Sequence, residues 1–145
     1  MDAERDQPWL VRHRLEVRFN DCDALGHANN AVYFTYLEQA RFTLWRRQLG
    51  CVAQPAALGQ RGPGFILARA ECDFKAQVRY GDQLEVRLRL AAIGRTSFTY
   101  DCEIADVSSG AIVAAARTVQ VHFDYDASQP TPIGDELRAK LGRPV

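Results

Sequence analysis

Hydrophobic and polar residues alternate near the N-terminus, which predicts a half-buried strand over residues 14–19. Its apolar face carries Leu15, Val17 and Phe19. Beyond residue 30 the apolar residues recur at steps of three and four instead, the period of an amphipathic helix. The predicted buried stripe contains Tyr33, Tyr36, Leu37, Ala40 and Leu44, and the residues off this stripe are Glu38, Gln39, Arg41 and Arg46.

Both ends of this helix carry suitable end residues. Asn29 or Asn30 is a natural N-cap. Arg46 and Arg47 suit the last turn, where cations oppose the helix dipole, and Gly50 suits the position just after it. The next residues, 51–64, are rich in Pro, Gly, Ala and Gln and are predicted to form a loop.

From Phe65 onward the pattern predicts successive strands separated by short turns. The expected strands cover 65–78, 84–90, 98–104 and 112–123, the last with Val119, Val121 and Phe123 on one face; the turns are Gly81–Asp82 and Ser108–Gly110. Turns this short join antiparallel neighbours, because parallel crossovers need many more residues. A short helix is expected over Asp135–Leu141 in a tail of residues 125–145.

The expected fold class is therefore α+β, with one long central helix wrapped by a strongly twisted antiparallel sheet of about five strands. We expect a single domain over residues 1–145, with its core over about 12–124. Such an open sheet has free edges that a second copy of the chain can cover, so a homodimer is expected.

Composition excludes several classes of protein. The 145 residues include 18 basic and 18 acidic side chains, so no basic excess points to a nucleic acid. The N-terminus is charged and lacks the apolar core of a secretory signal. No apolar run approaches the roughly 18 residues of a membrane span. Cys22, Cys51, Cys72 and Cys102 form no C-x-x-C pair, which favours reduced thiols in a cytoplasmic protein.

The connection between the first strand and the helix concentrates reactive groups. Residues 21–30 read DCDALGHANN, with two carboxylates around a thiol, a glycine, a histidine and two adjacent amides. We interpret this segment as a candidate active site.

The longer stretch RFNDCDALGHANNAVYFTYLEQAR, residues 18–41, resembles the opening motif of the hotdog-fold acyl-CoA thioesterases, and is most similar to the 4-hydroxybenzoyl-CoA thioesterase type. Three later segments resemble family segments in the same order. They are RYGDQLEV at 79–86, GRTSF at 94–98 and ARTVQV at 116–121. The likeness covers about residues 12–124.

The resemblance implies a hotdog domain, a dimer that often pairs into a tetramer, and hydrolysis of an acyl-CoA thioester. It implies that Asp23 is the catalytic carboxylate. It also implies that Arg95, Thr96 and Ser97 contact the CoA phosphates and pantetheine, although some members have a basic residue where this chain has Thr96. No metal or organic cofactor is implied, because CoA is part of the substrate.

The chemistry of thioester hydrolysis fits these residues. A carboxylate such as Asp23 is ionised at neutral pH, and it can activate water or attack the carbonyl itself. The unpaired N–H groups of the following helix can stabilise the developing oxyanion, and Gly26 permits a close backbone approach. We therefore take Asp23, His27 and Asn30 as candidate catalytic residues. The candidate substrate- or CoA-binding residues are Gly26, Tyr33, Arg95, Thr96 and Ser97.

Other interpretations remain open. Cys22 paired with His27 could act as a nucleophile, but two neighbouring aspartates disfavour a thiolate. Asp21, Cys22, Asp23 and His27 are possible metal ligands, yet His13 and His122 lie in strand-like runs without ligand spacing. Asp21 is expected to be structural, and Tyr33 and Tyr36 to pack in the core, with Glu38 solvated or paired with Arg41. The alternative functions are an acyl-carrier-protein thioesterase and an acyl-CoA-binding hotdog protein without hydrolysis, or one that performs hydration.

Overall fold

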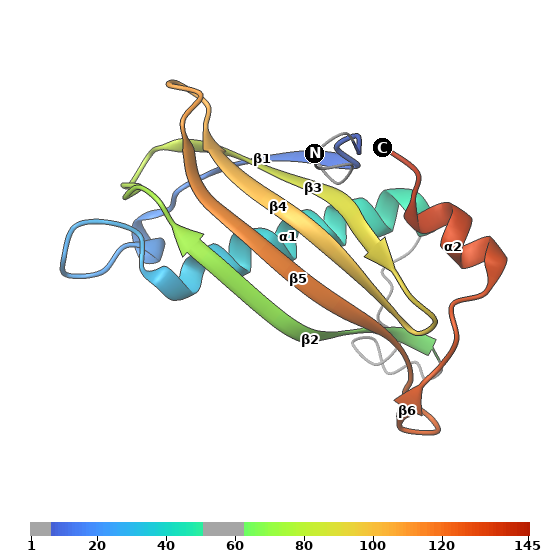
Figure 1. Cartoon of the computed structure of the whole chain (residues 1–145). Coiled ribbons are helices and arrows are strands. Elements are labelled where there is room, and N and C mark those ends of the chain that lie inside the picture. The colour runs from blue at the N-terminus through green and yellow to red at the C-terminus, as the bar shows by residue number, and fades with distance from the viewer. Residues whose placement is uncertain (1–6, 51–62) are drawn as a thin grey trace.

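A computed structural model of the chain describes residues 7–50 and 63–145. Cys51 and nearly all of the predicted 51–64 loop therefore lie outside the described residues. The elements, labelled in Figure 1, are β1 (Val11–Glu16), a short 3-10 helix (Phe19–Asp21), α1 (Asn30–Leu49), β2 (Pro63–Phe74), β3 (Gln83–Ile93), β4 (Ser97–Asp106), β5 (Ile112–Asp124), β6 (Gln129–Pro130) and α2 (Asp135–Leu141).

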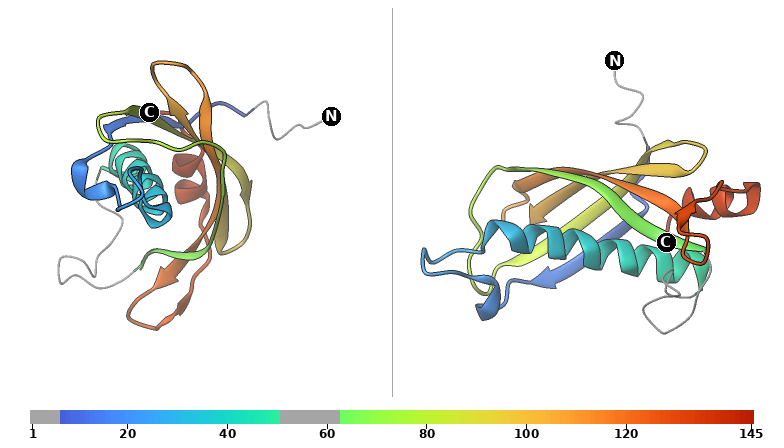
Figure 2. Two further views of the ribbon diagram at one scale, coloured as in Figure 1. Left: turned by 90° about the vertical axis from the view of Figure 1, so that its left-hand side faces the viewer. Right: turned by 90° about the horizontal axis from the view of Figure 1, so that it is seen from below.

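One antiparallel sheet has the order β1-β3-β4-β5-β2, and the two-residue β6 pairs with β5. The sheet twists and curves around α1, which lies along its concave face (Figure 2). The α+β hotdog architecture expected from the sequence is thus confirmed. No described helix is long and apolar enough to cross a membrane.

The ends and the stripe of α1 follow the sequence. Asn29 is the N-cap, and its side-chain oxygen accepts a hydrogen bond from the Ala31 N–H at 2.9 Å. Gly50 ends the helix with φ +72°, a conformation that glycine adopts without strain. The five predicted stripe residues are all buried. Arg41 was expected on the polar side, but it is only 5% exposed, because the wide concave sheet covers more of the helix than one stripe.

One strand prediction was wrong about which side chain faces inward. Phe19 is 76% exposed, because β1 ends at Glu16 and a 3-10 helix begins at Phe19. In β5, Val119 and Val121 lie on one face of the strand, and this face is not the one that α1 covers. The adjacent Thr118 and Gln120 are the fully buried residues of this strand segment.

The C-terminal tail packs onto the far end of α1. Gln48 Nε2 donates to the backbone oxygens of Leu141 and Arg143 at 3.0 and 2.8 Å. The Ile133 N–H donates to the Arg95 carbonyl in the β3–β4 turn at 2.7 Å. The tail, α1 and the β3–β4 turn therefore meet at the same end of the molecule (Figure 1).

Candidate active site

Asp21 is an internal anchor of the 21–30 loop. Its carboxylate accepts hydrogen bonds from the Arg18 guanidinium at 2.7 Å and the Tyr36 hydroxyl at 2.8 Å, and it is 2% exposed. Burial by itself would raise the pKa of Asp21, but the hydrogen bonds from Arg18 and Tyr36 outweigh it and hold the pKa below 3.8. Burial and the neighbouring carboxylate raise the pKa of Tyr36, which keeps its donating proton. These contacts fit the structural role expected for Asp21.

Asp23 is held by neutral donors. Its Oδ1 accepts from the Leu25 N–H at 2.9 Å, and its Oδ2 accepts from Asn29 Nδ2 at 3.1 Å. Gly26 closes the turn with φ +85°, and its N–H donates to the Asp23 carbonyl at 3.0 Å. A carboxylate oxygen accepts more than one hydrogen bond, so each oxygen keeps the capacity to accept a hydrogen bond from a water.

A pocket of about 250 Å³ opens beside this loop at the N-terminus of α1. Its lining includes three of the residues predicted from the sequence, His27, Asn30 and Tyr33, together with Ala28, Phe74, Lys75, Ala76 and Gln77. Tyr33 stacks edge-on against Phe74 with ring centroids 5.0 Å apart, and its hydroxyl donates to the Ala76 carbonyl at 3.3 Å. The strand end after Phe74 thus forms one wall of the pocket and the helix start forms the other.

The first turn of α1 offers a donor to this pocket. The Ala31 and Val32 N–H groups are engaged by the side chain and the carbonyl of Asn29. The Asn30 N–H, at the first helical position, has no acceptor among residues 7–50 and 63–145. A carbonyl oxygen that becomes negative near Asn30 would accept a hydrogen bond from this N–H. The positive end of the helix dipole would stabilise its charge.

His27 and Cys22 do not form the nucleophilic pair considered above. The His27 ring nitrogen Nδ1 lies 3.3 Å from the Ala28 carbonyl, and the Cys22 thiol donates to the Arg18 carbonyl at 3.8 Å. The His27 ring has no hydrogen bond to Asp23 either. In the part of the chain that the structure describes, no three His, Cys, Asp or Glu side chains gather as metal ligands.

The predicted CoA-binding residues Arg95, Thr96 and Ser97 lie at the other end of the molecule. They form the β3–β4 turn, beside the C-terminal end of α1, whereas the Asp23 loop precedes the N-terminal end (Figure 1). A helix of 20 residues spans roughly 30 Å. A single chain therefore brings together Asp23, Gly26, His27, Asn30 and Tyr33 and leaves Arg95–Ser97 apart from them.

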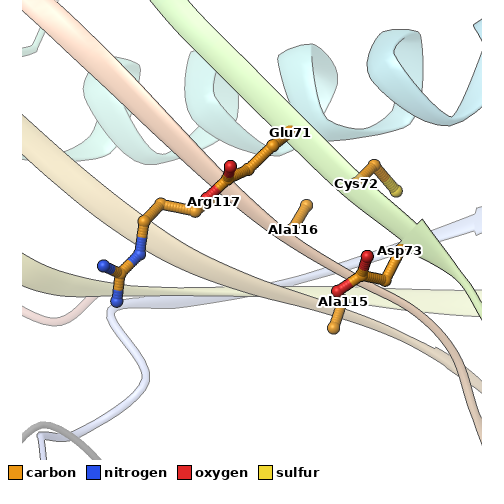
Figure 3. Close-up of a pocket in the computed structure, with 6 residues that line it drawn as sticks. All are labelled: Glu71, Cys72, Asp73, Ala115, Ala116 and Arg117. Atoms are coloured by element: carbon orange, nitrogen blue, oxygen red, sulfur yellow. The ribbon is translucent and has the colours of Figure 1, made fainter.

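A second hollow of about 350 Å³ lies on strands β2 and β5 (Figure 3). It is lined by Glu71, Cys72, Asp73, Ala115, Ala116 and Arg117, and by none of the predicted site residues. Arg117 Nε pairs with Asp101 at 2.7 Å. Because this hollow lacks a helix terminus and carries two exposed carboxylates, the smaller pocket is the better candidate for an active site.

Asn29 was not among the residues that the sequence predicted for the site. It was expected only as a helix cap, and Asn30 was taken as the candidate catalytic residue. In the structure Asn29 caps α1 and also holds Asp23, whereas Asn30 lines the pocket. The adjacent amides at 29 and 30 were the available signal, but only the backbone geometry decides which of them faces Asp23.

Comparison with known proteins places the chain in a family. The model of the Thioesterase-like superfamily matches residues 17–141, so the chain belongs to this superfamily. A 1,4-dihydroxy-2-naphthoyl-CoA hydrolase from Synechococcus elongatus is 26% identical over 125 residues, covering 84% of this chain and 88% of that protein. The match to the uncharacterized protein YsmA of Bacillus subtilis, 26% identical over 87 residues, covers 60% of this chain and 55% of that protein.

Solved structures agree with the fold. A thioesterase from Thermus thermophilus, solved with coenzyme A and Zn, is 30% identical, has a TM-score of 0.76, and is matched over 92% of this chain and 98% of that chain. The expected class, a thioester hydrolase with the hotdog fold, is thereby confirmed. The narrower 4-hydroxybenzoyl-CoA type stays a prediction.

Proposed function

We propose that this protein hydrolyses an acyl-CoA thioester to the free acid and CoA, with Asp23 as the reacting carboxylate. The observation that carries this proposal is the position of Asp23. Its two oxygens are oriented by Leu25 and Asn29, and its backbone N–H donates to the carbonyl of His27 at 3.2 Å. His27 lines the pocket at the start of α1, where the Asn30 N–H is unused. Family membership and the hydrolase activity named for the Synechococcus elongatus relative support the same chemistry.

Two routes use this arrangement. In one, Asp23 removes a proton from a water that attacks the thioester carbon. In the other, Asp23 attacks that carbon, the C–S bond breaks to release the CoA thiolate, and water then hydrolyses the mixed anhydride. Both routes place negative charge on the carbonyl oxygen, where the helix N-terminus stabilises it. His27 and Asn30, which line the pocket, are the candidates for orienting the water or the thioester.

We also propose that the active unit is a homodimer or a tetramer of dimers. Strand β2 ends the sheet order, and its side chains Leu67 and Phe74 are 48% and 44% exposed. Pairing of β2 with the same strand of a second copy would remove this free edge. A two-fold axis reverses strand direction, so the partner's β3–β4 turn would approach the first chain's Asp23 end. This arrangement would let Arg95, Thr96 and Ser97 bind the CoA of the neighbouring site.

The test is release of CoA thiol from short, long and aromatic acyl-CoAs by wild type, Asp23→Asn and a control, Asp135→Asn, in the exposed first turn of α2. We expect turnover by wild type and control and a loss of at least ~100-fold in Asp23→Asn. Turnover that survives in Asp23→Asn would refute the role of Asp23. If acyl groups are hydrolysed only when a carrier protein bears them, the result would favour an acyl-carrier-protein thioesterase. If acyl-CoA binds and no thiol is released, the result would favour an acyl-CoA-binding protein without hydrolysis.

A mixing experiment tests the shared site. Asp23→Asn and Arg95→Ala chains are each expected to be impaired alone. A mixed dimer has one site with both changes and one site with neither, so random mixing should restore about a quarter of wild-type activity. Light scattering gives the oligomeric state of each sample. If the subunits are shown to exchange and activity is still not restored, Arg95 does not contribute to the site of the neighbouring subunit.

A carboxylate mechanism needs no metal, and we propose that none takes part. Dialysis against EDTA should leave the rate unchanged, and added Zn²⁺ should not raise it. A cytoplasmic location and the absence of nucleic-acid or membrane partners stay predictions.

A further inference from the structure

The two walls of the candidate active-site pocket carry different side chains. The wall at the start of α1 has His27 and Asn30, the candidates for orienting the thioester. The wall at the end of β2 has Phe74, Lys75 and Gln77. An acyl group whose thioester lies at the start of α1 therefore extends toward the end of β2, and the far end of that acyl group meets Lys75 and Gln77.

Lys75 is the one lysine or arginine among the described residues that line this pocket, and none of those residues is an aspartate or a glutamate. The Lys75 ammonium group makes no hydrogen bond or ion pair with any residue in 7–50 and 63–145. Asp73, the acidic residue closest to Lys75 along the chain, lines the separate hollow on β2 and β5. The pocket therefore presents a cation without a counter-charge.

The backbone of Lys75 is fixed to both neighbouring elements. The Lys75 and Ala76 N–H groups donate to the Val113 carbonyl on β5, at 2.8 and 3.1 Å. The Tyr33 hydroxyl donates to the Ala76 carbonyl at 3.3 Å, which ties the same segment to α1. These bonds hold the Cα atom of Lys75 at the pocket wall, so only its side chain has to move to reach a ligand.

Lys75 also borders a further hollow of about 510 Å³, where Glu103 could neutralise it. The Glu103 carboxylate instead lies 3.7 Å from the Arg87 guanidinium, and it forms no ion pair with Lys75. The Gln77 side chain likewise makes no hydrogen bond with a described residue. Both polar side chains at the end of β2 are therefore available to a ligand at the rim of the pocket.

The body of the pocket is apolar and small. Tyr33 and Phe74 meet edge-on with ring centroids 5.0 Å apart, and Ala28 and Ala76 also line it. Pockets for drug-sized ligands have volumes of about 300–1,000 Å³, so a pocket of about 250 Å³ suits a short acyl group. The pocket thus matches an acyl group with a short apolar body and an anionic far end.

We propose that Lys75 and Gln77 bind a carboxylate at the far end of a short acyl group, so that the substrate is a mono-CoA thioester of a dicarboxylic acid. This inference rests on the proposed thioesterase function, and it names the substrate class of the same site. An ionised carboxylate only accepts hydrogen bonds, and the Lys75 ammonium and the Gln77 amide both supply N–H donors.

The test compares succinyl-, glutaryl- and adipyl-CoA with neutral partners in which an isopropyl group replaces the carboxylate. The readout is the ratio of kcat/KM within each pair, because a general change of activity cancels in this ratio. Wild type should prefer the carboxylate in at least one pair by about tenfold, the scale of a hydrogen bond to a charged group. The preference should weaken as NaCl is raised from about 0.05 to about 0.5 M, since the ion pair is partly exposed.

Substitutions of Lys75 assign the preference to its charge. Lys75→Met should lower the ratio to about twofold or less, a loss typical of a partly exposed ion pair. Lys75→Glu should reverse the preference, because like charges repel, and Lys75→Arg should keep it. Lys140→Met is the matched control, since Lys140 lies in α2 and pairs with Glu136 at 3.1 Å; it should behave like wild type. Equal rates within every pair for wild type, or a preference that survives in Lys75→Met, would overturn the inference. Hydrolysis of the neutral acyl-CoAs would then leave the thioesterase function standing.

The phosphates of CoA are the other anions of the substrate, and a second comparison separates them from the acyl carboxylate. The same acyl pairs are offered as N-acetylcysteamine thioesters, which contain no phosphate. Our inference requires that the preference for the carboxylate persist in these thioesters and be lost in Lys75→Met. If Lys75→Met instead weakens both members of each CoA pair equally and has no effect on the phosphate-free thioesters, Lys75 binds CoA and the inference is wrong.

Binding separates the inference from the proposed function. Non-hydrolysable thioether analogues of each pair are titrated calorimetrically against wild type, Lys75→Met and Lys140→Met. Tighter binding of the carboxylate analogue that is lost only in Lys75→Met would support the inference even if no thioester were cleaved. Equal binding of both analogues by wild type would overturn it.

Discussion

Asp21 and Asp23 stand two residues apart in the same loop, and the fold treats them in opposite ways. Asp21 is buried and paired with a guanidinium and a phenol. Asp23 is partly exposed and is held only by a backbone N–H and an amide. A carboxylate whose hydrogen-bond acceptor sites are occupied by a cation and a hydroxyl stabilises the fold. One that is partly exposed and oriented only by neutral groups is the better candidate for a reacting carboxylate.

The difference predicts that the two aspartates separate activity from stability. Asp23→Asn should lower kcat by at least ~100-fold, because an amide is neither a base nor a nucleophile at neutral pH. Its free energy of unfolding should change by less than about 1 kcal/mol, since only neutral hydrogen bonds are altered. Thiol release and thermal melting measure the two quantities on the same sample. A large loss of stability would show that Asp23 is structural like Asp21.

Asp21→Asn should give the reverse pattern. The loss of charge-assisted hydrogen bonds from Arg18 should lower the free energy of unfolding by about 2 kcal/mol. For a chain of this length that corresponds to a melting temperature roughly 4–8 °C lower. Below its melting temperature the activity of the variant should lie within about threefold of that of wild type. This corresponds to at most a modest change in the activation barrier of the reaction. A loss of activity comparable to that of Asp23→Asn, with the fold intact, would contradict the contrast.

Asn29→Ala tests the link between the helix cap and Asp23. Removing the cap should cost about 1 kcal/mol of stability. Because Asp23 Oδ2 also loses its donor, kcat should fall by roughly tenfold, the effect of one misplaced hydrogen bond. Asn30→Ala is the matched control for stability, since the Asn30 side chain caps nothing. Its free energy of unfolding should lie within a few tenths of a kcal/mol of that of wild type. If both substitutions destabilise the protein equally, loss of the helix cap does not explain the effect of Asn29→Ala.

The smallest expected effect is the dependence of stability on pH. The pKa of Asp21 is lower in the folded protein than its usual value of 3.8, so the unfolded chain binds more protons at acid pH. The stabilisation from Asp21 is therefore complete above about pH 5 and is lost as the pH falls below 4. The stability difference between wild type and Asp21→Asn should be constant from pH 5 to 7 and shrink below pH 4. If the stability difference grows on acidification instead, folding raises the pKa of Asp21 and the prediction is wrong.

Local pattern was sufficient for most of the fold. The period of the apolar residues identified α1, and Asn29 and Gly50 marked its ends, because capping depends only on neighbouring backbone groups. The turns at Gly81 and Gly110, both with positive φ, were equally readable. The position of the candidate active-site loop also followed from the sequence, since the candidate residues precede the helix directly.

The faces of the strands were harder to read. Phe19 was expected inside and is outside, because a 3-10 turn interrupts the alternation after β1. Thr118 and Gln120 were not expected to be the buried side chains of β5. A polar residue on the concave face looks like a surface residue in the sequence until the neighbouring strands and α1 are placed over it.

The sequence by itself determined which elements form, where α1 begins and ends, and which loop holds the carboxylates, because these depend on interactions among near neighbours. Only the tertiary structure decided that Asp21 is paired with Tyr36, that Asn29 rather than Asn30 holds Asp23, that Arg41 is buried beneath the sheet, and that Arg95–Ser97 lie at the far end of α1. Each of these depends on how distant segments are placed against one another or on the backbone geometry of the loop, and the spacing of residues along the chain does not determine either.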